Sequence, residues 1–479
     1  MTEYEFGCLI GGEWVEGEEE ILVLSPYDDS EVGRVLVPRE IDVDGLVKHA
    51  KEGLKSWKER RTYEVREALE EAARLVKKHE EELARIIALE GGKPIRDARF
   101  EVRRTAEVLR LCAGEAERIW GETLPGDAQP GRVSEAILTV REPVGVVLSI
   151  TPYNFPLMLP AHKLGPALAA RCSIVHKPAT ETPLSSLKLA ELLLDAGIDE
   201  RALQVVIGPG RELGERLVKA DFDALSFTGS REVGERLREI SPIPRMTLEL
   251  GGNDPVIVDE TVEDVEKVAE SVVQGACYHA GQVCIAVERA IVVEEVYDEF
   301  VEAAAEAAES LKVGDPLDED TDVGPLINDH ALEKVLKHIE DAVNRGAEVV
   351  TGGEPRERRL LPPTVLSDVP EDSLIAREET FGPVLPVIRV RDFDEALRVA
   401  NATEYGLHAA VFTNRLDRAV RAARELEAGG IIVNELTIYR ADYMPFGGVK
   451  GSGVGREGVP WAVREFTEEK TIVLGGEGR

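Results

Sequence analysis

From residue 143 to residue 250 the sequence repeats one pattern: an apolar run, a short loop and an amphipathic segment with helical spacing. Strands that alternate with helices are joined by crossovers, and they build a parallel, doubly wound sheet. Such a sheet binds its ligand beyond the carboxyl ends of its strands, so the polar residues there are the first candidates for a site. The expected strands are 144–150, 173–176, 203–207, 224–227 and 246–250, and the expected helices are 161–171, 183–196, 212–219 and 232–240.

A second α/β region is expected between about residues 255 and 436. At 479 residues the chain is too long for one ordinary core, which indicates two or three domains. The helices of this region are expected at 262–278, 297–311, 331–345, 393–400 and 418–427, and its strands at 290–293, 384–390, 409–412 and 430–433.

The remaining segments are less regular. The first forty residues indicate short strands and turns, and three helical stretches follow at 42–59, 63–89 and 94–118. The acidic and basic runs of these helices are interpreted as solvated faces. A Gly- and Pro-rich stretch, 121–132, precedes an alternating run at 135–140, and the chain ends in a strand at 471–474. The run and the terminal strand could pair with another subunit, which predicts a homo-oligomer, either a dimer or a tetramer.

Composition excludes several classes of partner. The net charge of −34 repels nucleic acid and anionic membranes. No run of about eighteen apolar residues and no secretory signal is visible, so the expected location is the cytoplasm. The five cysteines form no CxxC pair and the eight histidines are scattered, which indicates free thiols and no metal site. Charged residues reach 31% while Asn, Gln, Cys and Met are sparse, a pattern that favours a thermophilic source.

Cys284 stands in a segment, residues 275–286, that favours a reactive thiol. Helical spacing runs to about His279, and Gly281 is a plausible left-handed residue at the helix end. Cys284 then falls in a short loop before an apolar strand. The competing interpretation is a buried, inert cysteine, the usual state in a soluble chain. Glu249, flanked by leucines and followed by two glycines, would supply the tuned base that covalent catalysis by a thiol needs.

Further loops carry polar residues after expected strands, and each has a structural alternative. Asn154, between two prolines, has an amide donor that could meet developing negative charge, or it belongs to a simple turn. Lys177 could hold ribose hydroxyls or phosphate, or it is an exposed strand-end lysine. Gly229 permits close backbone approach at a helix start that favours a pyrophosphate, although the spacing is not GxGxxG. Glu378 and Glu379 could bind ribose hydroxyls, or they are solvated charges.

Together these segments resemble the NAD(P)-dependent aldehyde dehydrogenase superfamily along nearly the whole chain, in the order and spacing of that family. The matching segments are 152–156 (Pro-Tyr-Asn-Phe-Pro), 177–178 (Lys-Pro), 227–230 (Phe-Thr-Gly-Ser), 248–252 (Leu-Glu-Leu-Gly-Gly), 281–284 (Gly-Gln-Val-Cys), 378–383 (Glu-Glu-Thr-Phe-Gly-Pro) and 445–448 (Pro-Phe-Gly-Gly).

The resemblance implies the α/β aldehyde dehydrogenase fold, with two doubly wound parallel-sheet domains and a small β arm. The implied Rossmann-like NAD(P)-binding domain comprises residues 1–120 and 142–250. The implied catalytic domain comprises residues 251–450, and the oligomerisation arm comprises 121–141 and 466–479.

The resemblance also implies a role for each matching residue. Cys284 matches the nucleophile, Glu249 the general base that activates the hydrolytic water, and Asn154 the oxyanion donor beside the Cys284 backbone N–H. Lys163 and Glu457 match a proton-relay pair. The residues implied to bind NAD or NADP are Ile150, Thr151, Lys177, Thr180, Gly229, Ser230, Gly234, Leu250, Glu379 and Phe381.

Residues 151–157, 161–163 and 444–450 look most like archaeal lactaldehyde dehydrogenases, and relatives of non-phosphorylating glyceraldehyde-3-phosphate dehydrogenase are also similar. Phosphate-handling members commonly carry Arg before the nucleophile, whereas Val283 cannot pair with a phosphate. The expected reaction is therefore oxidation of a small 2-hydroxyaldehyde, lactaldehyde to lactate, as in deazaflavin-coenzyme synthesis in methanogens. Many NAD-specific members carry Glu at the position of Thr180, so NADP is permitted here and NAD is not excluded.

Other functions remain as alternatives. Oxidation of glyceraldehyde-3-phosphate or of succinate semialdehyde would use the same residues. A CoA-acylating relative generally lacks the base that Glu249 matches. A non-catalytic, nucleotide-binding homologue is the remote alternative, against which the combination of Cys284, Glu249 and Asn154 argues.

Overall fold

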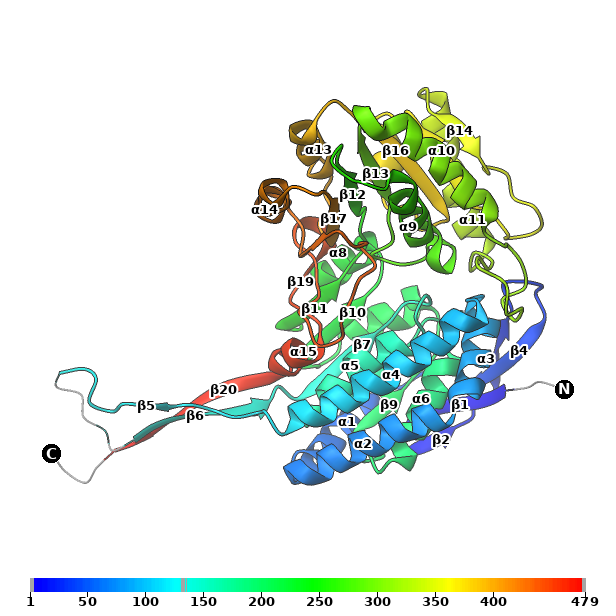
Figure 1. Ribbon diagram of the computed structural model, residues 1–479. Helices are drawn as coiled ribbons and strands as arrows, with labels where there is room; N and C mark the ends of the chain where they lie inside the picture. Colours follow the sequence, from blue (N-terminus) through cyan, green and yellow to red (C-terminus); the bar gives the residue numbers. More distant parts are fainter. Residues whose placement is uncertain (1–3, 131–133, 135, 476–479) are drawn as a thin grey trace.

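The computed structural model describes residues 4–130, 134 and 136–475. Residues 1–3, 131–133, 135 and 476–479, which fall within the expected N-terminal segment and the expected arm, lie outside the described residues. Two α/β units form the body of the molecule, and a three-stranded arm extends from it (Figure 1). The expected architecture of two largely parallel sheets with a small β arm is confirmed.

The lower unit of Figure 1 contains a ten-stranded sheet in the order β19-β11-β10-β7-β8-β9-β1-β4-β3, with β2 paired to β1. Its central strands are parallel, as the alternating pattern predicts. They are β7 (Val146–Ile150), β8 (Ser173–Lys177), β9 (Leu203–Val205), β10 (Ala224–Thr228) and β11 (Arg245–Glu249). The edges are extended by β1 (Tyr4–Ile10), β2 (Glu13–Val15), β3 (Glu19–Leu24) and β4 (Glu31–Val37), and by β19 (Gly453–Val454) on the other side.

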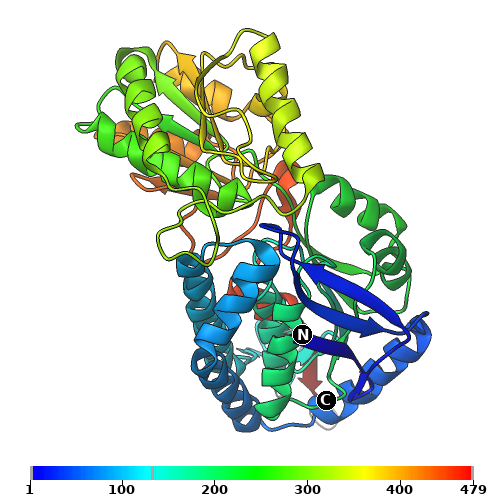
Figure 2. The ribbon, with the colours of Figure 1, turned by 90° about the vertical axis from the view of Figure 1, so that its right-hand side faces the viewer.

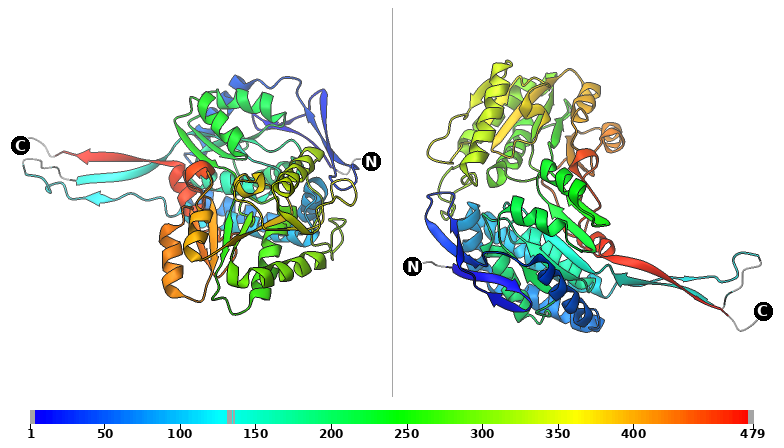
Figure 3. Two further views of the ribbon diagram at one scale, coloured as in Figure 1. Left: turned by 90° about the horizontal axis from the view of Figure 1, so that it is seen from above. Right: turned by 180° about the vertical axis from the view of Figure 1, so that it is seen from behind.

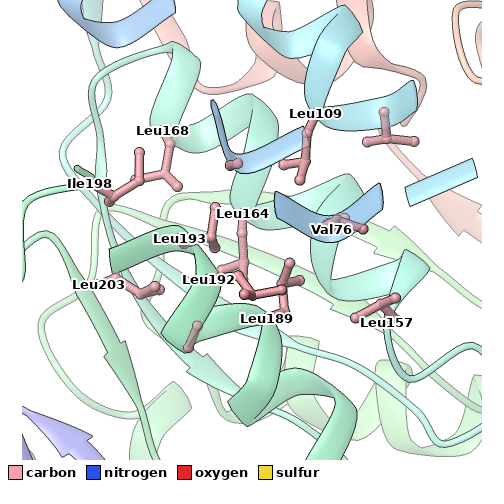
Figure 4. Packing of buried hydrophobic residues seen from close by; sticks show 14 of the residues in the cluster. Val76, Leu109, Leu157, Leu164, Leu168, Leu189, Leu192, Leu193, Ile198 and Leu203 are labelled. Atoms are coloured by element: carbon pink, nitrogen blue, oxygen red, sulfur yellow. The ribbon is translucent and has the colours of Figure 1, made fainter. Parts of the chain in front are cut away.

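Helices cover both faces of this sheet (Figure 2). Leu46 and Leu237 belong to the apolar cluster on one face, and Leu109, Leu164 and Leu189 to the cluster on the other (Figure 4). The helices of this unit are α1 (Val43–Trp57), α2 (Thr62–Lys78), α3 (Glu80–Gly91), α4 (Ile95–Ala116), α5 (Met158–Ala169), α6 (Leu184–Asp195), α7 (Glu215–Val218), α8 (Arg231–Ile240) and α15 (Val459–Glu465).

Three expected helices differ from the structure. The stretch 63–89 is two helices, α2 and α3, because the backbone leaves the helical region at His79. The stretch 212–219 is a π-helical turn, Gly210–Gly214, followed by the short α7. Two glycines in that turn weaken a regular helix. The helix expected at 262–278 is α9 (Val265–Cys277), and a 3₁₀ turn, Tyr278–Gly281, follows it.

The upper unit has a seven-stranded sheet in the order β14-β15-β16-β13-β12-β17-β18, parallel except for β14. Its strands are β12 (Pro255–Val258), β13 (Arg289–Val293), β14 (Glu348–Thr351), β15 (Thr364–Ser367), β16 (Val384–Val390), β17 (His408–Phe412) and β18 (Gly430–Val433). Its other helices are α10 (Glu294–Ser310), α11 (Asp329–Asn344), α12 (Leu374–Arg377), α13 (Phe393–Ala400) and α14 (Leu416–Glu425). The sequence analysis did not predict β12, β14 or β15, each of which is four residues long.

The arm consists of β5 (Thr123–Leu124), β6 (Ala136–Pro143) and β20 (Thr467–Leu474), and it projects from the body in Figure 1 and in both views of Figure 3. β6 and β20 pair antiparallel from Pro143 with Thr467 to Ala136 with Leu474. The expected terminal strand is therefore present and begins earlier than residue 471. Within the described ranges, no helix has both the length and the apolar character that a membrane crossing requires.

Candidate active site

Neighbouring parallel strands of the lower sheet end side by side at one edge. β11 ends at Glu249, β7 at Ile150 and β8 at Lys177, and Ile150 pairs in register with Lys177. Gly229 follows β10 directly, and its N–H donates to the Glu249 carbonyl at 3.1 Å. The strand pattern therefore brings together four residues that the sequence analysis named.

The loop that carries Cys284 begins with an uncommon backbone. After α9 ends, His279, Ala280 and Gly281 all have positive φ angles, of 51°, 55° and 70°. The expected left-handed Gly281 is present, and a Cβ there would lie 2.0 Å from the carbonyl oxygen of Gly382. The sequence did not predict that two non-glycine residues share this conformation, which costs roughly 1–2 kcal/mol for each.

Gln282 fixes this turn and connects it to Asn154. Its Nε2 donates to the His279 carbonyl at 3.3 Å, and its Oε1 accepts from the Ile327 N–H at 2.9 Å. The Asn154 Nδ2 donates to the Gln282 carbonyl at 2.8 Å. A side-chain amide carries two N–H groups, so a second donor of Asn154 remains near the Cys284 loop.

Cys284 lies at a cavity of about 420 Å³, a size within the usual range for ligand sites. The same cavity is lined by Asn154, Gly229, Glu379 and Phe381. Cys284 is partly exposed, whereas the other four cysteines are buried. The accessible thiol thus lies at a concave site between the two sheets, as a nucleophile requires.

Glu249 is a buried carboxylate that is 2% exposed. Neither of its carboxylate oxygens has a hydrogen-bond partner among the residues that the structure describes. A Cβ on Gly447 would lie 2.7 Å from Glu249 Oε1, so glycine leaves room for the carboxylate there. Burial and the negative charge of Glu457 raise the pKa of Glu249 well above its ordinary value, against the charges of Lys163 and Arg440.

A buried charge cluster stands behind Glu249. Lys163 Nζ donates to Glu457 Oε1 at 2.7 Å and to Ser226 Oγ at 3.0 Å. Arg440 Nη2 donates to Glu457 Oε2 at 3.2 Å, and its guanidinium carbon lies 3.7 Å from the centre of the Phe446 ring. Burial raises the pKa of Glu457, but Lys163 and Arg440 outweigh it and lower the pKa to about 2. Glu457 is therefore ionised at neutral pH.

Three further polar residues named in the sequence analysis are Lys177, Thr180 and Glu379, and of these Glu379 lines the cavity. Lys177 is buried, and burial lowers its pKa to about 8. Thr180 Oγ1 donates to the Gly208 carbonyl at 3.0 Å, which ties the end of β8 to the segment after β9. Glu379 Oε1 accepts from the Gly252 N–H at 3.1 Å, and burial raises the pKa of Glu379 to about 8.

The start of α8 packs tightly against the end of β11. Ser230 is the N-cap residue of α8, and its hydroxyl accepts from the Val233 N–H at 3.4 Å. A Cβ on Gly234 would lie 2.3 Å from Leu250 Cδ2, so a larger residue there would require the Leu250 side chain to move.

Phe381 has a φ of 59°, and its N–H donates to Glu288 Oε1 at 3.0 Å.

Comparison with known proteins decides the family. The sequence signature of the aldehyde dehydrogenase family matches residues 14–472. The chain belongs to the aldehyde dehydrogenase family. The resemblance of the seven motifs is thereby confirmed.

Two curated relatives illustrate the similarity. The 3-sulfolactaldehyde dehydrogenase of Priestia megaterium is 43% identical over 471 residues, which cover 98% of each chain. The lactaldehyde dehydrogenase of Methanocaldococcus jannaschii is 38% identical over 473 residues, 97% of this chain and 99% of that protein. Among solved structures, the NADP-dependent glyceraldehyde-3-phosphate dehydrogenase of Bacillus halodurans complexed with NADP has a TM-score of 0.96 at 38% identity, covering 99% of this chain and 100% of that chain.

In this member of the aldehyde dehydrogenase family, the polar groups at the strand ends fit a nicotinamide dinucleotide. The hydroxyls of Thr151 and Thr228 are buried and lack a hydrogen-bond partner in the described part of the chain. The N–H groups at the start of α8, after Gly229, favour a pyrophosphate. Lys177 and Glu379 carry the donor and acceptor groups that ribose hydroxyls need.

Sequence reasoning missed several residues of this aldehyde dehydrogenase site. Asn328, His330 and Lys334, at the start of α11, line the cavity, and so does Tyr405. Helix α11 is amphipathic, and its sequence gives no sign that its first turn faces a ligand. Arg440 was also missed, and the signal available was an arginine five residues before the Pro-Phe-Gly-Gly motif.

The thiol of Cys284 is not ionised by its protein surroundings alone. Burial raises its pKa well above the ordinary value, and the carboxylates of Glu379 and Glu249 raise it further, while Arg440 lowers it. The thiolate is the reactive form of cysteine. Ionisation of Cys284 therefore needs a proton acceptor, or a positive charge that arrives with a ligand.

Proposed function

We propose that this protein oxidises a small aldehyde to its carboxylic acid with NAD or NADP, through a covalent thioester on Cys284. The observation that carries this proposal is the partly exposed thiol at the cavity, with the Asn154 amide tied to its loop. The unpaired, buried carboxylate of Glu249 does not line that cavity, but its charge acts on the thiol. This is the combination that covalent catalysis followed by hydrolysis requires.

The proposed mechanism assigns one task to each residue. The Cys284 thiolate attacks the aldehyde carbon, and the Asn154 amide and the Cys284 backbone N–H hold the resulting oxyanion, each donor contributing about 3 kcal/mol. The bound nicotinamide supplies the hydride acceptor. The thioester that remains is hydrolysed by a water whose proton passes to Glu249, and Lys163 and Glu457 relay that proton onward.

Each residue proposed to bind the cofactor is assigned to one part of the dinucleotide. Lys177 and Glu379 would bind the two ribose hydroxyl pairs, Gly229 and Ser230 the pyrophosphate, and Phe381 the nicotinamide side. The neutral Thr180 leaves NADP acceptable, because it places no negative charge against a 2′-phosphate. Ile150, Thr151, Gly234 and Leu250 would shape the walls of the cofactor site.

We assign the substrate to the small 2-hydroxyaldehydes, with lactaldehyde as the first candidate. Val283, beside the nucleophile, is apolar and buried and offers no charge to a phosphate. The similarity to a lactaldehyde dehydrogenase over 97% of this chain supports the same choice.

A second candidate is 3-sulfolactaldehyde, which is favoured by one feature of the site. Arg440 Nε is buried and without a hydrogen-bond partner among the described residues, although Arg440 Nη2 pairs with Glu457. Arg104, on α4, contacts the same loop, because its Nη2 donates to the Arg440 carbonyl at 3.4 Å and also pairs with the Asp442 carboxylate. The unpaired Nε–H of Arg440 is a donor that suits an anionic sulfonate, and the relative of that name is 43% identical.

A substrate panel tests both candidates. Lactaldehyde, 3-sulfolactaldehyde, glyceraldehyde-3-phosphate, succinate semialdehyde and propanal are each assayed with NAD and with NADP. We expect kcat/KM for a 2-hydroxyaldehyde to exceed that for propanal at least ~10-fold. If the sulfonate is bound, Arg440→Met loses activity on 3-sulfolactaldehyde much more than on propanal. Preference for the phosphate, or release of acyl-CoA instead of free acid, would contradict the assignment.

The pH dependence should respond to Glu457. Glu249 acts as a base only when ionised, so its raised pKa makes activity fall as the pH decreases through that pKa. Glu457→Gln removes a charge that raises this pKa, and the acid limb of the kcat profile should move to lower pH. Lys163→Met removes a charge that lowers it, and the limb should move to higher pH. Identical acid limbs in both variants would contradict the effect of these two charges on the pKa of Glu249.

We further propose a function for each of the two domains and for the arm. Residues 1–120 and 142–250 would bind the cofactor, and residues 251–450 would supply the catalytic thiol. The arm, 121–141 and 466–479, exposes Leu124, Val473 and Leu474, which suits contact with another subunit of a cytoplasmic homodimer or homotetramer. Size-exclusion chromatography with light scattering tests this, and a monomer would contradict it.

A further inference from the structure

A buried ion pair lies beneath the loops that carry Asn154 and Cys284. Lys93 follows α3 and Glu101 is on α4, and both side chains are fully buried. Lys93 Nζ donates to Glu101 Oε2. The interpretation of the charged runs in the expected helices as solvated faces is therefore wrong for Glu101, whose carboxylate is buried and faces the start of α5.

This pair contacts three residues that closely follow Asn154. Glu101 Oε1 accepts from the N–H of Leu157 at 3.0 Å and of Met158 at 3.1 Å, which satisfies free donors at the start of α5 (Leu157 is labelled in Figure 4). Lys93 Nζ lies 3.5 Å from the centre of the Phe155 ring, a close cation–π contact.

The Phe155 ring connects the same pair to the Cys284 loop. Its centre lies 6.5 Å from that of Tyr278 and 6.2 Å from that of His279, one of the left-handed residues. Phe155 also belongs to the apolar cluster that contains Val283, next to the thiol. The Phe155 ring therefore contacts residues of the Cys284 loop and belongs to the loop of Asn154, and Lys93 contacts the same ring.

The stability of the fold does not account for such a pair. Removing two charges from water is expensive, and apolar replacements of a buried ion pair are often neutral or stabilising. The contacts of Lys93 and Glu101 instead converge on the two loops that would form the oxyanion site. We propose that Lys93 and Glu101 form a positioning pair that sets the Asn154 amide relative to Cys284. This inference rests on the proposed function.

The chain offers a matched control in Glu90. This carboxylate is also fully buried, and it accepts from the N–H of Leu184 at 2.8 Å and of Ser185 at 2.9 Å, at the start of α6. Burial raises the pKa of Glu90 to about 7. It thus caps a neighbouring helix in the same way, on an element that carries none of the proposed catalytic residues.

The test compares the double variant Lys93→Met/Glu101→Gln with Glu90→Gln, using propanal and saturating cofactor. The glutamine carbonyl can still cap α5, so we expect a folded protein with cofactor Kd and KM close to wild type. Rates of acylation and deacylation should both fall roughly 10²-fold, because small displacements of reacting groups have effects of that size. Glu90→Gln should keep wild-type rates, and Lys93→Arg should retain most of the activity.

Unchanged rates in a folded double variant would overturn the proposal, and so would equal losses in the double variant and Glu90→Gln. If the double variant does not fold, Glu101→Gln alone carries the test with the same outcomes. The wild-type enzyme is assayed in the same series, and its inactivity towards every aldehyde would contradict the proposed function rather than the positioning role.

Discussion

Replacement of Cys284 by serine should abolish aldehyde oxidation, lowering kcat by on the order of 10⁴-fold or more, because it removes the covalent path itself. A serine hydroxyl ionises far less readily than a thiol, and the only base proposed near it is Glu249. Reduction of NAD(P) by the variant is measured directly, with circular dichroism to confirm that the fold is retained.

Cys277 provides the control for this substitution. It lies at the end of the helix that leads to the same loop, it is 3% exposed, and burial raises the pKa of its thiol to about 12. Cys277→Ala should keep most of the activity and should keep the alkylation of Cys284 by iodoacetamide. Substantial turnover by Cys284→Ser, or equal loss in the two variants, would show that the reaction does not depend on the Cys284 thiol.

Glu249→Gln should separate the two halves of the reaction. Glutamine has nearly the same shape but cannot accept a proton from water, so hydrolysis of the thioester should slow by roughly 10²–10⁴-fold. Formation of the thioester needs Cys284 and Asn154 and should persist. The expected record is a burst of NAD(P)H, close to one equivalent for each active site, followed by a slow steady state.

Stopped-flow absorbance of NAD(P)H measures this burst. If Glu249→Gln shows no burst, and thioester formation and hydrolysis are slowed equally, Glu249 acts in acylation or supports the fold. A variant with wild-type steady-state turnover would mean that another group activates the water.

The sequence was informative where periodicity and local motifs determine structure. Alternating strands and helices predicted the parallel core of the lower sheet, and the strand-end rule placed Glu249, Ile150 and Lys177 together. The apolar and glycine context of Cys284 predicted an accessible thiol beyond a helix. Each of these inferences depends on residues close to one another in the chain.

Features that depend on distant contacts were not predictable in this way. Lys93 and Glu101 look like the solvated charges around them, because their burial depends on contacts with Phe155 and with the start of α5, which are distant in the sequence. The positive φ angles of His279 and Ala280 depend on contacts made by Gln282 and on the close approach of Gly382. The guanidinium of Arg440 gains its role from Glu457 and Phe446, which follow it in the chain but give no pattern with it.

The covalent step can be measured directly by trapping it. Glu249→Gln is mixed with lactaldehyde and NADP, quenched in acid and digested, and the peptide that contains Cys284 is weighed by mass spectrometry. The predicted result is an acyl adduct on Cys284 in an amount equal to the NADPH burst, absent when the cofactor is omitted. A burst with an unmodified Cys284, or an adduct on another residue, would contradict a thioester at this site.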